Sequence, residues 1–145
     1  MKGLFKTALL CSALFVQSCV MADDKPIQLN QMPANVQQVV KTHFADQKIA
    51  IAKVDGWFWK EYDVVFTNGN KIEFDSKGNW TEVECKNSEV PASLVPAAIA
   101  KYVKENYPQA KVMGLSRDRQ GYDVKLANGI ELEFNQQYQL IDIDD

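Results

Sequence analysis

The sequence predicts an α+β fold in which tandem α-β-β-β-β repeats form one antiparallel sheet with two helices on one face. Two observations support this prediction. The hairpin sequence YDVVFTNGNKIEF, residues 62–74, returns sixty positions later as YDVKLANGIELEF, residues 122–134. An amphipathic helix pattern precedes each hairpin, with Pro33 and Pro96 at matching positions. Such a sheet buries only the side that its helices cover, so its other side is expected to meet water or a partner.

The turn sequence fixes the register of each hairpin. A two-residue loop at Asn68-Gly69 would set apolar side chains opposite charged ones on the same face. A three-residue loop, with Gly69 in the left-handed region as a bulge, places Val64 opposite Ile72 and gives one apolar face. In the second copy only a loop of residues 127–129 gives the same result. Both hairpins are therefore predicted to turn through three residues that end in glycine.

The other elements follow in the same order in both halves, because the spacing of apolar residues changes from a helical to a strand period in each. A polar lead-in at 23–30, expected to be flexible, precedes the first repeat. Trp80 and Val83 are three residues apart, so both can face the core only if their strand contains a bulge, and its register stays open. The predicted helices lie within 32–47 and 94–108, and the strands outside the hairpins lie at 48–54, 80–85, 110–115 and 140–144.

The first 22 residues have the anatomy of a secretory signal, with Lys2 and Lys6 around the start of an apolar run at 4–16. Cleavage after Ala22 fits the small residues there. In the alternative, residues 16–19 form a lipoprotein signal in which Cys19 is acylated, although Gln17 fits such a signal poorly. Both alternatives stay open. The protein is in either case expected to be exported, periplasmic or secreted, with membrane contact only through a lipid on Cys19. The predicted organisation is a signal peptide at 1–22, a first repeat at 23–85 and a second repeat at 86–145, the two repeats forming one structural domain.

Charge and cysteine content narrow the possible partners and chemistry. The whole chain has 16 basic and 19 acidic residues, and loss of Lys2 and Lys6 with the signal leaves 14 against 19. The mature chain is thus acidic and has no basic stripe, which argues against nucleic acid as a partner. Cys85 is the one cysteine outside the signal region, and we expect it to be buried because free cysteine is among the most buried residue types.

With these motifs the chain resembles the PepSY-like family of small exported bacterial proteins, also called β-lactamase-inhibitor-like. The resemblance rests on HFADQ and NYPQA at the helix ends, on YDVVFTNGNKIEFDSKGNW and on YDVKLANGIELEF, and it covers nearly all of the mature chain. It implies a tandem-repeat α+β sheet like that of β-lactamase inhibitory proteins, whose exposed concave sheet grips an enzyme. No inhibitory residue is carried over, because the shared motifs consist of turn and core residues.

The residue types that most catalysis needs are missing. His43 is the single histidine, so neither a pair of histidine ligands nor a triad with a spare imidazole can be assembled, and we expect it to be a half-buried structural residue. Glu73, Glu131 and Glu133 alternate with core residues, which predicts that they keep the open sheet face soluble rather than act as glycosidase carboxylates. The acidic end IDIDD lacks the spacing and the glycine of a calcium loop. No catalytic residue, metal or cofactor is therefore expected.

One feature exceeds what the fold needs, the Trp-Phe-Trp sequence at 57–59, for which the second half has no aromatic counterpart. If the phase of the following strand continues backwards, the tryptophans share the open face with residues of that strand. The residues concerned are Trp57, Trp59, Asp63 and Val65. Exposed clusters of this kind mark interaction sites. In the alternative arrangement, the segment folds back and tucks its indoles under a sheet edge or a helix end.

We therefore expect an exported, non-enzymatic binding protein that recognises a protein or peptide of the cell envelope with its open sheet face. Inhibition of an enzyme is one form that such recognition takes. The expected binding residues are the four named above, with the two tryptophans as anchors. The alternative function is the binding of a small molecule or envelope ligand in a pocket between the helices and the sheet, which a deep apolar cavity with convergent polar groups would favour.

Overall fold

The structure is a computed structural model that describes residues 24–145, so the predicted signal peptide, its cleavage site and Cys19 lie outside the described residues. Its helical elements are η1 (Leu29–Gln31), α2 (Ala34–His43), η2 (Ala92–Leu94) and α3 (Ala97–Asn106). Its strands are β1 (Lys25–Pro26), β2 (Ile49–Asp55), β3 (Glu61–Phe66), β4 (Lys71–Phe74), β5 (Trp80–Glu84), β6 (Val112–Arg117), β7 (Gly121–Leu126), β8 (Glu131–Asn135) and β9 (Leu140–Asp144).

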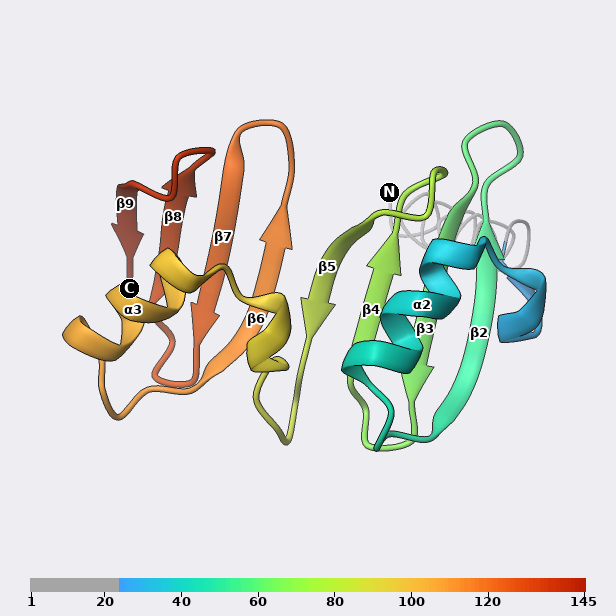
Figure 1. The fold of residues 1–145 in the computed structure, drawn as a ribbon, viewed down its shortest axis with the longest axis horizontal. Helices are drawn as coiled ribbons and strands as arrows, with labels where there is room; N and C mark the ends of the chain where they lie inside the picture. Colours follow the sequence, from blue (N-terminus) through green and yellow to red (C-terminus); the bar gives the residue numbers. More distant parts are fainter. Residues whose placement is uncertain (1–23) are drawn as a thin grey trace, which may run out of the picture.

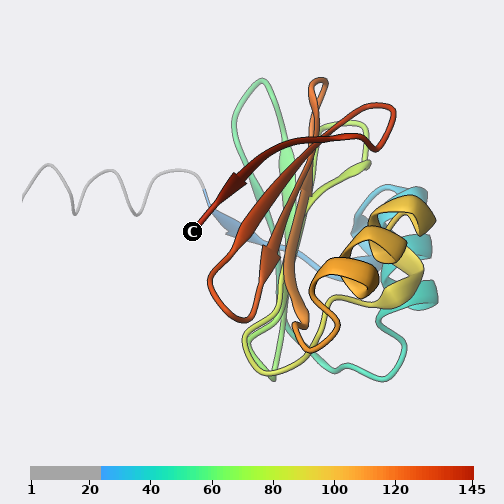
Figure 2. The same cartoon turned by 90° about the vertical axis from the view of Figure 1, so that its left-hand side faces the viewer.

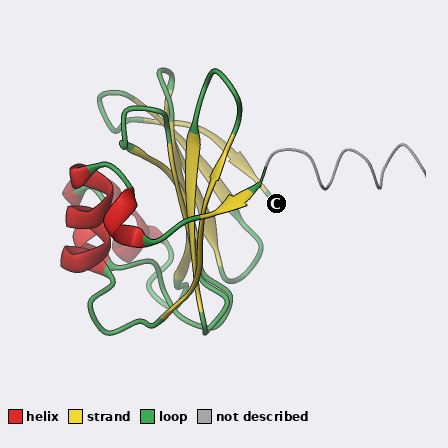
Figure 3. Ribbon diagram, turned by 90° about the vertical axis from the view of Figure 1, so that its right-hand side faces the viewer, coloured by secondary structure: helices red, strands yellow, loops and turns green. Residues whose placement is uncertain are grey.

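All nine strands form one antiparallel sheet, in which their spatial order is their order along the chain (Figure 1). Both helices lie against the same side of this sheet, and the views along it show no helix on the other side of the described chain (Figures 2 and 3). The predicted α+β fold with a one-sided sheet is thus confirmed. The lead-in at 23–30 differs from the expectation, because β1 pairs with β2 and η1 follows it.

Both hairpins have the predicted register. Val64 lies opposite Ile72 in the first hairpin, and Val124 lies opposite Leu132 in the second. Gly69 and Gly129 have φ angles of 88° and 89°, in the region that disfavours residues with a Cβ. Each glycine N–H donates to the carbonyl group three residues earlier at 3.0 Å. The two turns are therefore alike, as the duplication of their sequences predicts.

The strand that contains Trp80 has the bulge that its sequence requires. Val83 lies opposite Ile72, but Trp80 lies opposite Phe74, so one extra residue is accommodated between them. As a result Trp80 and Val83 are both buried in the core. An equivalent shift in β9 places Leu140 opposite Phe134.

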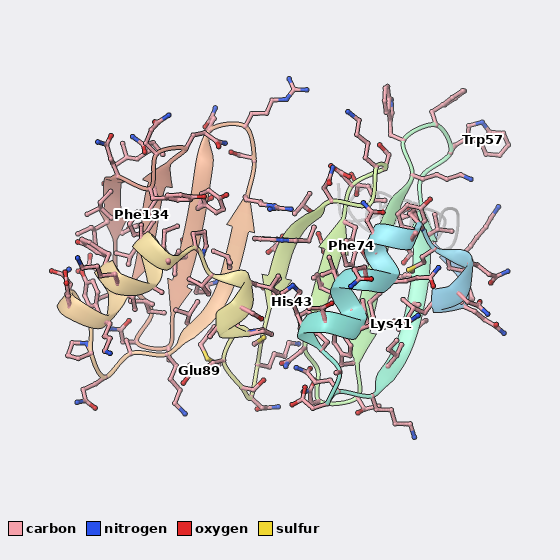
Figure 4. The ribbon with its side chains drawn as sticks, in the orientation of Figure 1. Lys41, His43, Trp57, Phe74, Glu89 and Phe134 are labelled. Carbon is pink, nitrogen blue, oxygen red and sulfur yellow. The ribbon has the colours of Figure 1, made fainter. Side chains whose placement is uncertain are left out.

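The core fills the space between the two helices and the covered side of the sheet. Val36 and Val40 of α2 are buried there, as are Ile99 and Val103 of α3. Aromatic rings reinforce both halves, with Phe44 stacked on Phe66 at 4.8 Å and Tyr102 edge-on to Phe134 at 5.5 Å between ring centroids. Phe74 and Phe134 occupy equivalent places in the two halves (Figure 4).

The two halves join where β5 pairs with β6. Val83 lies opposite Leu115 in this pair, and both side chains are buried. Arg117 closes one end of the joint, because its Nε donates to the Trp80 carbonyl oxygen at 2.7 Å and its guanidinium group lies 3.9 Å from the centre of the Trp80 ring. Guanidinium groups are attracted to the face of an indole. The sheet is therefore continuous from one repeat to the next.

Asn70 connects the first hairpin to the segment between the repeats. Its side chain is fully buried. Nδ2 donates to Gln47 Oε1 at 3.1 Å and to Ser88 Oγ at 2.7 Å, while Oδ1 accepts from the backbone N–H of Lys86 at 3.1 Å. The equivalent position in the second half is Ile130, so this polar connection belongs to the first repeat alone.

We predict that Asn70→Ala lowers the free energy of unfolding by about 1–3 kcal/mol, because it leaves buried hydrogen-bonding groups without a partner. Asn128→Ala, which changes an exposed asparagine in the turn of the other hairpin, is the matched control and should cost less. Urea unfolding followed by circular dichroism measures both. Equal losses in the two variants would show that the buried amide has no special role.

Candidate functional site

The three consecutive aromatic residues lie in the loop between β2 and β3. The side chains of Trp57, Phe58 and Trp59 are 81%, 85% and 80% exposed. Trp57 projects from this loop, away from the sheet and the helices (Figure 4). Burial of the indoles under a sheet edge or helix end, one of the two arrangements expected, is therefore wrong.

The structure brings only two of the four predicted binding residues together. Asp63 and Val65 lie on β3 and face the open side of the sheet, where Val65 is opposite Lys71. The tryptophans do not continue this alternation, because β3 begins only at Glu61. Gly56, which has a φ of 89°, turns the chain just before Trp57. Trp57 and Trp59 thus lie beyond the end of the sheet face. Whether any of the four residues binds a partner remains a prediction.

The open face of the sheet carries a surface that no single motif revealed. Residues that are paired across neighbouring strands point to the same side. One row of pairs runs from Glu73 through Glu82, Ser116, Asp123 and Glu133 to Asp142. The next row runs from Lys71 through Glu84, Gly114, Lys125 and Glu131 to Asp144. We call the part of these rows on β5–β9 the acidic face; its charged members are Glu82, Glu84, Asp123, Glu131, Glu133, Asp142, Asp144 and Lys125.

The same surface on the first half is balanced. Lys53 Nζ lies 3.4 Å from Asp63 Oδ2, and Lys71 Nζ lies 3.7 Å from the same oxygen and also contacts Glu73. In the second half, Ser116 and Glu131 stand where the first half has the two lysines. The duplication has therefore kept the backbone and changed the charge.

A hollow of about 180 Å³ lies in the acidic face at the joint between the halves. Gly114 lies in its lining and provides no side chain, whereas the equivalent residue in the first half is Ile51. The charged residues around it are Glu82, Glu84, Asp123, Lys125 and Glu131. Lys125 provides the one positive charge among these residues, and its Nζ lies 3.6 Å from Glu131 Oε1.

Crowding of the open face shifts the proton affinity of its carboxyl groups. Burial raises the pKa of Glu82, and the negative charges of Glu73 and Glu84 raise it further. Burial also raises the pKa of Asp123, with the charge of Asp118 acting in the same direction. The open face is therefore a place where additional negative charge is resisted and positive charge would be accepted.

The histidine and the cysteine of the described chain both have structural roles. Half-buried His43 places Nδ1 2.6 Å from Ser93 Oγ, which links α2 to η2. Cys85 is buried as expected, and burial raises the pKa of its thiol to about 11, so it stays protonated at neutral pH. Among residues 24–145, no group of three or more potential metal-ligating side chains is close enough to hold an ion. Within the same range, no helix has the length and apolar character of a membrane span.

A second hollow, of about 360 Å³, lies on the helix side of the second half and is open to solvent. Val103 and Tyr107 at the end of α3 contribute to its wall, together with Val95 and Val112. Lys104 and Glu89 lie at the same hollow. It corresponds in position to the pocket that the alternative function requires, but it is an open depression and not a deep cavity.

The one-sided duplicated sheet with its open acidic face defines a tandem-repeat α+β protein. The chain belongs to the family described as "Putative beta-lactamase-inhibitor-like, PepSY-like", which it matches over residues 19–56 and 60–142. The match leaves out 57–59, the three aromatic residues. No curated protein matches the chain.

Three solved structures share the fold. A protein from Bacteroides vulgatus ATCC 8482, described as a "putative periplasmic protein from DUF2874 family", is 56% identical over 86% of this chain and 99% of that one, with a TM-score of 0.81. A "putative calcium-regulated periplasmic protein" from Bacteroides thetaiotaomicron is 55% identical over 84% and 97%, with a TM-score of 0.82. A second Bacteroides vulgatus protein, a "putative periplasmic protein of unknown function", is 35% identical over 84% and 99%, with a TM-score of 0.78. These descriptions confirm the exported location that the sequence predicts.

We predict that Glu133→Gln stabilises the protein by about 0.5 kcal/mol, because Glu133 lies opposite Asp123 on one side and Asp142 on the other. Lys71→Gln is the control of opposite sign, since it removes the partner of Asp63 and Glu73. Thermal melting at low ionic strength measures both. A loss of stability in Glu133→Gln would show that the carboxylate row is not repulsive.

The stability of the protein should also rise as the pH falls from neutral towards the ordinary pKa range of carboxyl groups, about 4. The pKa values of Asp63, Glu82 and Asp123 are raised in the folded state, so the folded chain takes up protons more readily than the unfolded chain. The gain is fully present below the pKa values of the unfolded chain and is lost as the pH rises through the raised pKa values of the folded chain. Melting temperatures in buffers of constant ionic strength test this, and a steady fall towards pH 5 would contradict it.

Proposed function

We propose that this protein is a periplasmic binding protein that recognises a positively charged protein surface or peptide with its acidic face. The observation that supports it best is the row in which Asp123, Glu133 and Asp142 lie opposite one another. Like charges directly across a sheet are destabilising. The first half has an equivalent acidic row, but Lys53 and Lys71 offset its charge, whereas the second half has no cation at either of these two places. A cationic partner would relieve this repulsion.

The shape of the acidic face suits a macromolecular partner better than a small one. The face extends over five adjacent strands, β5 to β9, and its hollow of about 180 Å³ is small compared with that extent. Neighbouring strands are about 4.8 Å apart, so the face is roughly 20 Å wide. A basic segment of protein or peptide can contact several carboxylates over such a width. The inhibitor-like description of the family supports the same kind of recognition.

The proposed activity is binding and not catalysis. The single imidazole of the chain is held against Ser93, and the thiol of Cys85 is buried and protonated. The carboxylates of the acidic face lie on an exposed sheet surface, outside any deep cleft that would exclude water from a reaction. These features support a non-enzymatic role.

Two other ligands have weaker support. A calcium ion is a candidate because one relative is described as calcium-regulated and the acidic face offers oxygen ligands. The described residues, however, form no cluster of three potential ligands. A small apolar molecule is a candidate for the hollow beside α3, but that hollow is open to solvent.

The proposed partner can be trapped from the acidic face by site-directed cross-linking. Because Cys85 is unreactive, Glu133→Cys provides a single accessible thiol for a benzophenone maleimide, and Glu105→Cys on α3 provides a matched control on the helix side. We expect light-dependent, salt-sensitive cross-links to a polypeptide of the envelope from position 133 and not from 105. Adding Asp123→Lys to the first variant should reduce the yield at least tenfold.

Cross-links of equal yield from both positions, or none from either, would contradict the proposal. A calorimetric titration with calcium chloride is run in parallel. Saturable calcium binding that Glu133→Gln weakens, without any polypeptide cross-link, would assign the acidic face to the ion instead.

A further inference from the structure

The aromatic loop between β2 and β3 is an addition to the fold. Asp55 pairs with Glu61 across this loop, leaving five residues between them. In the second half, the backbone N–H of Asp118 donates to the Gly121 carbonyl oxygen at 3.0 Å, with two residues between. The loop is thus three residues longer than its counterpart, and the family match also omits 57–59. The fold therefore forms without Trp57, Phe58 and Trp59.

The backbone holds these side chains outward. A Cβ at Gly56 would lie 2.3 Å from the Trp59 carbonyl oxygen, so the chain is tightly folded at this point and only glycine fits. The Gly56 N–H donates to the Asp55 carboxylate at 2.6 Å. The loop presents three large aromatic side chains, each at least 80% exposed, on a convex tip.

A convex aromatic tip suits a fluid apolar layer. Hot-spot aromatics at protein interfaces lie in well-packed pockets ringed by other contacts. The neighbours of this tip are instead Lys60, Glu61 and Asp55, which are polar. Tryptophan, with an apolar ring and one N–H group, is enriched at the boundary between water and lipid, where no matching pocket is needed.

The start of the described chain lies next to this loop. Lys25 pairs with Val54, and Asp24 Oδ2 accepts a hydrogen bond from Lys53 Nζ at 2.7 Å. Cys19, one of the two expected processing sites, is six residues before Lys25 and can lie at most about 20 Å from it, even in a fully extended chain. A lipid on Cys19 would therefore hold the membrane within reach of the aromatic loop.

The charge of the protein does not oppose this arrangement. The acidic face is centred on β7, and β3 and β7 are separated by three other strands. At about 4.8 Å per strand this distance is roughly 20 Å, which exceeds the screening length of about 8 Å at physiological ionic strength. Near the loop, the exposed Lys25 and Lys60 can meet lipid phosphate groups, and the acidic neighbours Asp24, Asp55 and Glu61 offset their charge, so this end of the sheet is not basic.

We propose that Trp57, Phe58 and Trp59 form a membrane-docking tip that inserts into the interfacial layer of an envelope lipid bilayer. The bilayer then lies across the end of the β2–β3 hairpin, and the acidic face stands at an angle to it. The tip is a second site, independent of the acidic face.

The test uses the chain that begins at Asp23, which carries no lipid and retains every described element. Vesicles of phosphatidylethanolamine and phosphatidylglycerol are the probe. We expect the protein to float with the vesicles, with a blue shift of tryptophan emission and quenching by brominated lipid. These fluorescence changes report on Trp57 and Trp59, because Trp80 is already buried and does not respond. Replacing all three residues together (Trp57→Ser, Phe58→Ser, Trp59→Ser), or deleting 57–59, should weaken flotation more than about tenfold.

The control is the double substitution Ile141→Ser and Ile143→Ser, which removes exposed apolar side chains, 61% and 46% accessible, from β9. It should leave flotation unchanged. The proposal is overturned if the unaltered protein stays in solution, or if the triple serine variant floats equally well. It is also overturned if the loop proves to join two copies of the chain or to capture a protein while vesicles are ignored. Melting temperatures confirm that each variant is folded.

Discussion

The pairing of β5 with β6 is the constraint on which the rest of the molecule depends. Each repeat alone would be a small meander, of five strands (β1–β5) or four (β6–β9), with a helix on one side and an exposed edge strand, an arrangement that invites uncontrolled pairing. Joining the two edges converts a pair of small sheets into one, and it places Val83 and Leu115 in a shared core. The joint also makes the uncovered side continuous, because the rows of paired residues pass from one repeat to the other without a break.

Duplication separates the requirements of folding from those of recognition. The covered side keeps the same residue classes in both halves, with Val64 and Val124 or Phe74 and Phe134 in equivalent places, because packing tolerates little change. The uncovered side carries no such requirement, so the lysines of the first half are replaced in the second. The loops are equally free, and the β2–β3 loop has gained its aromatic residues without disturbing the strands that it joins.

The sequence alone predicts the features that local chemistry determines. An Asn-Gly pair between alternating apolar residues fixes both hairpin registers, because a shift by one residue would expose the core. The same alternation predicts a bulge in the strand of Trp80, but it does not predict at which residue the bulge lies. The direction of Trp57 and Trp59 could not be predicted, because strand phase ends where Gly56 turns the chain. The acidic face could not be predicted either, since it arises from pairing between residues that are far apart in the sequence, such as Glu82 and Ser116. β1 escaped prediction because two residues carry no periodic pattern.

The two outer edges of the sheet are unequal. On one side the terminal strand is two residues long and contains Pro26, which has no N–H group to offer. On the other side β9 is a full strand whose acidic residues repel a like-charged neighbour. Secreted sheets that lack such features can stack end to end into fibrils. In this molecule, strand addition is disfavoured at one edge by the missing N–H of Pro26 and at the other by the charges of Asp142 and Asp144, and this protects the sheet from end-to-end stacking.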